Sequence, residues 1–234
     1  MSQRVDNEPA YVLHTHPWKE TSLIVEALTA GHGRVGLVAR GARRAHSALR
    51  TRLLGFQPLT LSWYGKGGLK TLHTAEWQGG ALQLAGRALI CGFYVNELIM
   101  KLVPPDDPHL TLYQRYEQTL HALAAAEDPQ PVLRRFELIL LSELGYAQTL
   151  DRTVEGEAVS PDRHYGYAFG QGVVSGMQTE VYCSGQTLLD MAAGDYSDPR
   201  TLAESKQFMR ALINHYLGDK PLHTRRLLLD LQTL

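Results

Sequence analysis

One stretch of the sequence carries most of the side chains that could bind a polyanion. No Asp or Glu occurs between Ala27 and Ala75. The cations in this stretch are Arg34, Arg40, Arg43, Arg44, Arg50, Arg52, Lys66 and Lys70. Arginine predominates, and its guanidinium matches phosphate oxygens bidentately. This composition predicts a surface that binds a nucleic-acid backbone with salt-dependent affinity; the alternative is a basic face that contacts only solvent.

Aromatic side chains close to these cations could stack on unpaired bases. Tyr64 is the favoured platform because it alternates away from Leu59 and Leu61. Trp63 shares the face of those two leucines, and this pattern favours a position in the core. Trp18 follows Pro17 in an expected loop, where a stacking role and a plain surface role both stay open.

The first 80 residues show five short β-type runs separated by glycine turns. In the third run, Val35, Leu37 and Ala39 alternate with Arg34 and Arg40, which predicts one buried face and one basic face. Five strands in about 80 residues predict a small closed barrel, most simply an OB-fold. The expected strands cover residues 10–15, 23–28, 34–40, 59–64 and 69–76.

After residue 80 the pattern becomes helical. Helices are expected over 84–103, from Asp106 or Asp107 onwards, over 132–144, from Asp198 to Leu217, and over 221–231. Residues 151–184 are rich in glycine and short β-type pieces, typical of a small irregular or hairpin insert. We therefore predict an α+β protein, with an OB-fold DNA-binding domain at 1–80 and a mainly helical domain at 81–234 that contains this insert.

The formal charge divides along the chain. Residues 1–80 hold ten basic and five acidic side chains, a balance of +5, whereas the remainder holds thirteen and nineteen, a balance of −6. The overall value of −1 therefore hides two parts of opposite sign. This division predicts a basic module for nucleic acid and an acidic module for protein contacts.

Several other classes of function lack support in the sequence. Cys91 and Cys183 stand alone, and neither a zinc-ligand pattern nor a phosphate-binding glycine motif occurs. No arrangement typical of catalysis is present, so we expect no enzyme activity, no cofactor and no metal. Residues 1–9 are polar and resemble no signal peptide, and the apolar helix at 84–103 is interrupted by charges, so we expect a cytoplasmic, nucleoid-associated protein.

Two alternatives to DNA binding stay open on residues alone. One is an RNA-binding OB-fold module joined to a helical domain that mediates protein interactions. The other is a hydrolase that uses scattered His, Asp and Glu side chains. Comparison of RNA with DNA affinity, and assays for nuclease or nucleotidase activity with Mg²⁺ or Zn²⁺, would separate them.

Motifs along nearly the whole chain, from about residue 10 to 228, resemble the RecO family of bacterial recombination mediators. Each motif is moderately specific, and their order and spacing are strongly so. They are the runs at 11–26, 33–44 and 47–49, Phe56-Gln-Pro-Leu, Tyr94-Val-Asn-Glu-Leu, Leu133-Arg-Arg-Phe-Glu-Leu with Leu144-Gly-Tyr, and the run at 217–225.

The resemblance implies binding of single- and double-stranded DNA, annealing of complementary strands, and help in loading recombinase on strands coated with single-stranded-DNA-binding protein. A RecR-type mediator and the recombinase are the implied partners. Many relatives carry four zinc-binding cysteines in the insert. Here the insert holds only Cys183, which removes zinc from consideration and leaves open what orders the segment.

RecO-like proteins also bind the acidic, Phe-ended tail of single-stranded-DNA-binding protein, which requires a cation beside an apolar pocket. Arg134, on the helix that holds Leu133 and Phe136, is our candidate for this cation, and Arg135 is the second choice. Both could equally be ordinary surface arginines. Near the C-terminus, Lys220, Arg225 and Arg226 could extend the DNA surface or only interact with helix ends.

Overall fold

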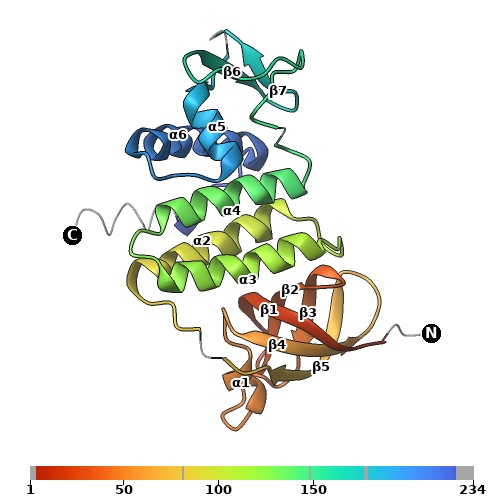
Figure 1. The fold of residues 1–234 in the computed structure, drawn as a ribbon. Coiled ribbons are helices and arrows are strands. Elements are labelled where there is room, and N and C mark those ends of the chain that lie inside the picture. Colours follow the sequence, from red (N-terminus) through yellow and green to blue (C-terminus); the bar gives the residue numbers. More distant parts are fainter. Residues whose placement is uncertain (1–3, 81, 148, 177–178, 225–234) are drawn as a thin grey trace. The chain divides into compact units, whose positions relative to one another are not determined.

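The computed structural model describes residues 4–80, 82–147, 149–176 and 179–224 (Figure 1). The chain divides into two compact units, one of residues 1–125 with 222–234 and one of residues 126–221. The first unit contains the β-rich segment together with two helices. The proposed domain boundary at residue 80 stays a prediction.

Five strands of the first unit close into a barrel in the order β1-β2-β3-β5-β4. Only the β3–β5 pair is parallel. This arrangement confirms the predicted five-stranded OB-fold barrel, and each expected run falls within an observed strand or within one residue of it. The elements are β1 (Arg4–Trp18), β2 (Ser22–Thr29), β3 (Gly33–Ala39), a short helix α1 (Ala48–Arg52), β4 (Pro58–Tyr64) and β5 (Leu69–Trp77).

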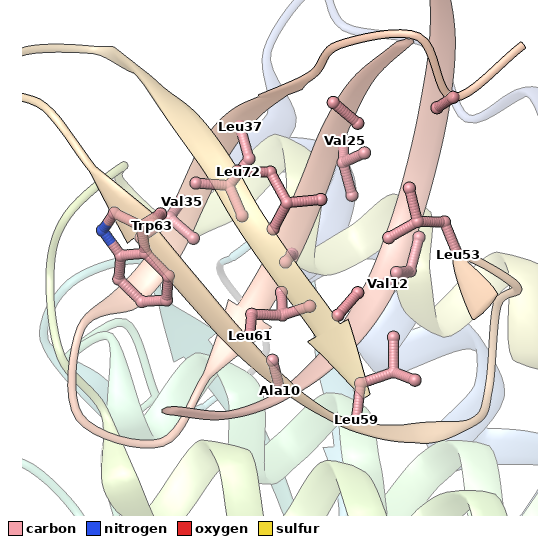
Figure 2. Packing of buried hydrophobic residues seen from close by; sticks show 14 residues of the cluster. Ala10, Val12, Val25, Val35, Leu37, Leu53, Leu59, Leu61, Trp63 and Leu72 are labelled. Atoms are coloured by element: carbon pink, nitrogen blue, oxygen red, sulfur yellow. The ribbon is translucent and has the colours of Figure 1, made fainter. Parts of the chain in front are cut away.

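The barrel interior is filled by one side of each strand (Figure 2). Val35, Leu37 and Ala39 are fully buried, as their alternation predicts, and Trp63, also buried, belongs to the same cluster. Trp63 is therefore a core residue, as its alternation with polar neighbours indicates. Leu53, just after α1, packs into the same cluster. The strands consequently present Arg34 and other polar side chains on the outer face.

Two helices, α2 (Gly86–Leu102) and α3 (Leu110–Ala125), complete the first unit. Buried polar groups join them to the barrel. Asn96 donates to the carbonyl oxygen of Leu13 at 2.9 Å and accepts from the Tyr116 hydroxyl at 2.7 Å. The Tyr11 hydroxyl donates to Glu117 at 2.8 Å. Because burial of an unpaired amide or hydroxyl is costly, these pairings fix how the helices sit on the barrel.

The second unit consists of helices and a three-stranded sheet of order β7-β6-β8. The β-type pieces of the predicted insert become these strands. Asp198 and Gly218 cap α6 at the predicted ends, and Gly145, with a φ of 72°, follows α4 in the left-handed region. The elements are α4 (Gln130–Glu143), β6 (His164–Ala168), β7 (Gly172–Ser175), β8 (Tyr182–Ser184), α5 (Gly185–Ala193) and α6 (Pro199–Leu217).

Helix α5 has no counterpart in the expectations from sequence. Ser184 is its N-cap, with a side chain that accepts from the Thr187 amide, and Gly194 ends it in the left-handed conformation. These cap residues are the pattern that could have located the helix, which begins directly after the predicted insert at 151–184. Most of the expected helix at 221–231, with Arg225 and Arg226, lies outside the described residues.

Within the described ranges, every helix is too short or too polar to cross a lipid bilayer.

Candidate nucleic-acid interface

A groove on the barrel brings together cations from two separate segments. Its volume is about 390 Å³, and it is lined by Trp18, Lys19, Thr21, Ser22, Val38, Arg40, Gly41, Arg44 and Thr71. The β1–β2 turn supplies Lys19, and the segment after β3 supplies Arg40 and Arg44. Trp18, at the end of β1, is 40% exposed. The lining therefore combines three cations with one accessible indole and includes no carboxylate.

The chain after β3 is folded so that two of its arginines face this groove. Gly41 adopts a φ of 69°, a conformation that favours glycine, and the chain reverses direction there, directly after Arg40. The side chain of Arg44 lies next to Gly41. Ala42 is fully buried and anchors the reversal. The Arg43 side chain instead contacts the β1–β2 turn, where it donates to the Lys19 carbonyl oxygen at 3.3 Å, and its amide donates to the Thr21 carbonyl oxygen at 2.9 Å.

Two of the predicted DNA-binding residues are engaged in ion pairs inside the first unit. The Arg34 guanidinium donates to Glu26 at 2.8 Å and to the Val103 carbonyl oxygen at 3.1 Å. The Lys70 ammonium lies 2.5 Å from a carboxylate oxygen of Asp106. These acids lie outside the acid-free stretch and reach it only through the fold. A DNA contact by Arg34 or Lys70 stays a prediction.

The other predicted residues lie around the barrel surface. Tyr64 is exposed and pairs across β4 and β5 with Thr71, which lines the groove, while its ring meets His73 edge to face. Lys66 is exposed in the β4–β5 turn, and Arg50 is exposed on α1. Arg52 donates to the Ala75 carbonyl oxygen at 3.1 Å, away from the groove. The groove thus unites Arg40 and Arg44 with Trp18 and Lys19.

Lys19 was not among the residues predicted from sequence. It precedes Glu20 and lies outside the acid-free stretch, so the absence of nearby acids does not single it out. The expected barrel could have indicated it, because OB-folds bind oligonucleotides on the face of strands 2 and 3 and in the loop between strands 1 and 2. Lys19 stands in that loop.

The two arginines proposed for tail binding have different surroundings. Arg134 is 9% exposed, and its guanidinium donates to the buried Glu137 at 2.6 Å. Arg135 is exposed; its Nε donates to the Gly194 carbonyl oxygen at 2.9 Å, and its guanidinium carbon lies 5.4 Å from the centre of the Tyr196 ring. Of the two, Arg135 is the cation that a ligand can reach without displacing a carboxylate.

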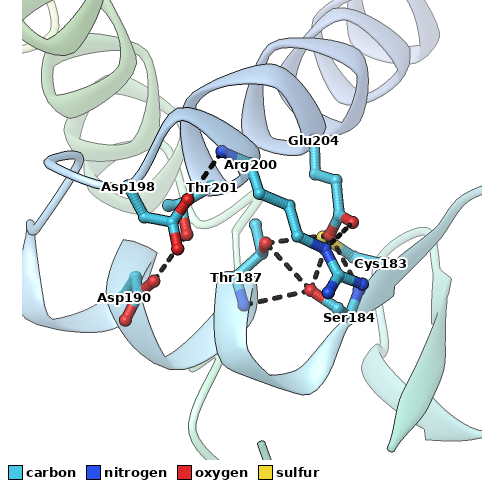
Figure 3. A network of polar contacts seen from close by, with 8 residues as sticks. All are labelled: Cys183, Ser184, Thr187, Asp190, Asp198, Arg200, Thr201 and Glu204. Atoms are coloured by element: carbon cyan, nitrogen blue, oxygen red, sulfur yellow. Dashed lines mark hydrogen bonds and ion pairs between the residues drawn. The ribbon is translucent and has the colours of Figure 1, made fainter.

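A carboxylate network holds the end of the insert in the second unit (Figure 3). One oxygen of Glu204, on α6, accepts from the Ser184 hydroxyl at 2.6 Å and from the Thr187 hydroxyl at 2.8 Å. The other accepts from Arg200 at 3.0 Å. Burial opposes ionisation, but these hydrogen bonds lower the pKa of Glu204 to about 2. The network ties the β8–α5 junction to α6.

The remaining cysteine of the insert belongs to this network. The Cys183 thiol lies 3.7 Å from Glu204, and burial together with that neighbouring charge raises the pKa of the thiol to about 12. Among the described residues, no three His, Cys, Asp or Glu side chains lie close enough together to hold a metal ion. Hydrogen bonds from Ser184 and Thr187 to Glu204 hold the C-terminal end of the insert.

Known protein families and individual proteins match this chain over nearly its full length. The family described as Recombination protein O N terminal matches residues 1–80, and Recombination protein O C terminal matches residues 83–226. Proteins named DNA repair protein RecO are similar over nearly full length: 52% identity in Azoarcus sp. (100% of this chain and 99% of that protein) and 51% in Nitrosospira multiformis (99% and 98%).

A third relative of the same name, from Burkholderia pseudomallei, is 53% identical over 99% of this chain and 86% of its own length. The similarity covers the barrel with its basic groove as well as the helical unit. The chain therefore belongs to the RecO family of DNA repair proteins.

Proposed function

We propose that this protein is a non-enzymatic recombination mediator that binds single- and double-stranded DNA in the groove of Trp18, Lys19, Arg40 and Arg44. The observation that carries the proposal is the lining of that groove, which combines three cations and an indole without a carboxylate. Arginine and lysine neutralise phosphates, and an accessible indole stacks on unpaired bases of any sequence. We expect little sequence preference, because phosphate contacts carry no base information.

Annealing of complementary strands follows from the same chemistry. Two DNA strands repel each other, and a cationic surface that binds their backbones reduces this repulsion while base edges stay free to pair. No covalent step is required. In this proposal the protein anneals strands coated with single-stranded-DNA-binding protein and, together with a RecR-type mediator, helps to load recombinase on them.

Contact with the coating protein is assigned to the second unit. An acidic peptide tail needs a reachable cation, and Arg135 is exposed beside the Tyr196 ring. Arg134 would first have to leave Glu137, with which it shares a buried ion pair. We therefore assign the tail contact to Arg135 in preference to Arg134.

The test of the proposal is annealing of complementary strands precoated with single-stranded-DNA-binding protein, at two salt concentrations. Arg40→Glu with Arg44→Glu should abolish annealing and reduce the slope of log affinity against log salt by about 1.4 for single strands. Lys206→Glu with Arg210→Glu, two exposed cations of α6, makes the same charge change and should anneal normally.

Two results would contradict the proposal. Unchanged DNA affinity in the Arg40 and Arg44 double variant would place DNA elsewhere on the protein. Tighter binding of an RNA oligonucleotide than of DNA with the same sequence would favour an RNA-binding module. For the tail, Arg135→Glu should weaken binding of an acidic, Phe-ended peptide and leave binding of naked DNA unchanged.

A further inference from the structure

A second pocket lies on the barrel at the opposite end of β5 from the basic groove. Its volume is about 530 Å³, and Thr51, Arg52, Leu54, Gln57, Glu76 and Trp77 line it. Thr71, which lines the groove, and Trp77 are six residues apart on the same strand. At about 3.3 Å per residue, roughly 20 Å separate the two sites.

Trp77 presents an accessible indole in this pocket. It pairs with Leu59 across β4 and β5, so its side chain leaves the strand on the face that elsewhere fills the barrel core. Because Trp77 is the last residue of β5, it stands beyond the closed part of the barrel and is 56% exposed. Its ring therefore offers a large flat apolar surface on which a planar group can stack.

The other walls come from the segment around α1. Leu53 is buried in the barrel core, and this anchor leaves the next residue, Leu54, 55% exposed at the pocket. Arg52 is held beside the indole by its hydrogen bond to the Ala75 carbonyl oxygen. Glu76 also borders the pocket, but it leaves β5 on the opposite face from Trp77 because side chains alternate along a strand.

We propose that this pocket receives an unpaired base of a DNA single strand, with Trp77 and Leu54 against the base and Arg52 beside its phosphate. Two links with the basic groove favour a nucleic-acid occupant over a peptide. Arg50 and Arg52 continue the acid-free segment that supplies Arg40 and Arg44, and β5 joins the two sites. An aromatic face next to a cation is also the arrangement that binds single strands without regard to sequence.

The inference rests on the proposed DNA binding and extends it to a longer path on the barrel. A strand that occupies both sites must span about 20 Å, so an oligonucleotide of about 16 residues should use both. One of about 4 residues is at the lower limit of an OB-fold site and should fill only one of them. The contribution of Trp77 should therefore depend on the length of the DNA.

Tryptophan emission of the full chain can test this. In a Trp18→Phe variant, Trp77 is the exposed tryptophan and Trp63 is buried, so a change in emission on DNA binding reports Trp77. Addition of oligothymidylate of about 16 residues should quench that emission. In the otherwise native chain, Trp77→Ala should raise the Kd for this DNA about five- to 150-fold, and Trp77→Phe should raise it less.

Tyr182→Ala is the matched control, because it removes a 62% exposed aromatic side chain from the second unit. It should leave DNA affinity unchanged. If the native chain binds DNA but Trp77→Ala binds equally well and Trp77 emission does not change, the pocket assignment is wrong and the proposed function survives. If the native chain binds no single-stranded DNA, both fail. Loss of a protein partner in Trp77→Ala, with DNA affinity intact, would also overturn the assignment.

Discussion

The guanidinium of Arg134 donates to the carboxylate of Glu137 at 2.6 Å, one turn further along α4, and both side chains are buried. The pair bears on the proposed assignment of the tail contact. A cation that already neutralises a buried carboxylate is a structural residue, whereas Arg135, next in sequence, remains accessible. The choice between two adjacent arginines is thus made by the direction in which each leaves the helix.

Removal of either partner of the buried pair should destabilise the second unit. Arg134→Ala removes the guanidinium that faces the buried carboxylate of Glu137, and breaking a buried ion pair costs about 3–5 kcal/mol in the free energy of unfolding. Arg135→Ala should cost less than about 1 kcal/mol, because its side chain is exposed. Denaturant unfolding measures both. Arg134→Met with Glu137→Leu should regain most of the loss, and failure to do so would show that the charges themselves are required.

The Glu204 network should give the second unit a defined dependence on acid. The pKa of Glu204 is about 2 in the folded protein and about 4.3 in an unfolded chain, so the folded state favours the ionised form. The stabilisation is complete above about pH 5 and declines as pH falls from about 4 towards 2. Thermal unfolding across this range should show the loss in the native protein, and Glu204→Gln should flatten it.

Reactivity of the Cys183 thiol provides a local readout of the same network. Its pKa of about 12 and its burial should make it inert to iodoacetamide at pH 8. Glu204→Ala removes the acceptor shared by Ser184 and Thr187 and should make Cys183 react faster while Cys91, buried in the first unit, stays protected. Arg200→Ala, which removes only an exposed partner of Glu204, should change the rate little. Equal reactivity of Cys183 in the native protein and in both variants would contradict the network's role.

Much of the fold could be predicted because local patterns and tertiary packing agree. The alternation of Val35, Leu37 and Ala39 matches a barrel strand with one buried face, and Asp198 and Gly218 mark the two ends of α6. Helix α5 was missed because its capping residue, Ser184, is also the last residue of the glycine-rich stretch that predicted an irregular insert. Capping depends on one hydrogen bond, from the Thr187 amide to Ser184, which composition does not reveal.

The residues of the candidate site were harder to predict from sequence, because the sequence does not show which cations form ion pairs. An acid-free stretch indicates net charge, but ion pairs form between segments that are distant in sequence. Lys70 meets Asp106 and Arg34 meets Glu26 only once the barrel and the segment after α2 are folded. Conversely, Lys19 lines the groove although Glu20 follows it directly in the sequence. Which cations remain available for DNA is therefore a property of the fold.

The Lys70–Asp106 pair yields a prediction about DNA affinity. Because the Lys70 side chain is only 13% exposed and its ammonium faces Asp106, Lys70→Ala should reduce DNA affinity much less than Arg40→Ala does. Asp106→Asn should release the ammonium and raise the affinity a few-fold, and asparagine tolerates the positive φ of 59° at this position. Fluorescence anisotropy with labelled single strands measures all three. Equal losses in the Lys70 and Arg40 variants would mean that Lys70 leaves Asp106 to bind DNA.

Gly33, at the start of β3, should be the least replaceable glycine of the barrel. Its φ is 67°, and a Cβ added there would lie 2.0 Å from the backbone carbonyl oxygen of Asp107. The same contact region holds a hydrogen bond from the Asp106 amide to the Arg34 carbonyl oxygen at 2.8 Å. Gly33→Ala must therefore push apart two backbone segments and should cost about 3 kcal/mol or more in unfolding free energy.

Gly67 is the matched control for this prediction. It has a φ of 87°, but a Cβ added there would meet nothing within 4 Å. Gly67→Ala thus measures only the cost of a positive φ for a residue with a Cβ, and it should lower the free energy of unfolding by about 1 kcal/mol. Comparison of the two variants by denaturant unfolding separates the close approach from the conformation. If both lose the same free energy, β3 and the segment before α3 do not meet as closely as described. The Lys70–Asp106 ion pair and the hydrogen bond from Arg34 to the Val103 carbonyl oxygen, which involve the same segment, would then also be in question.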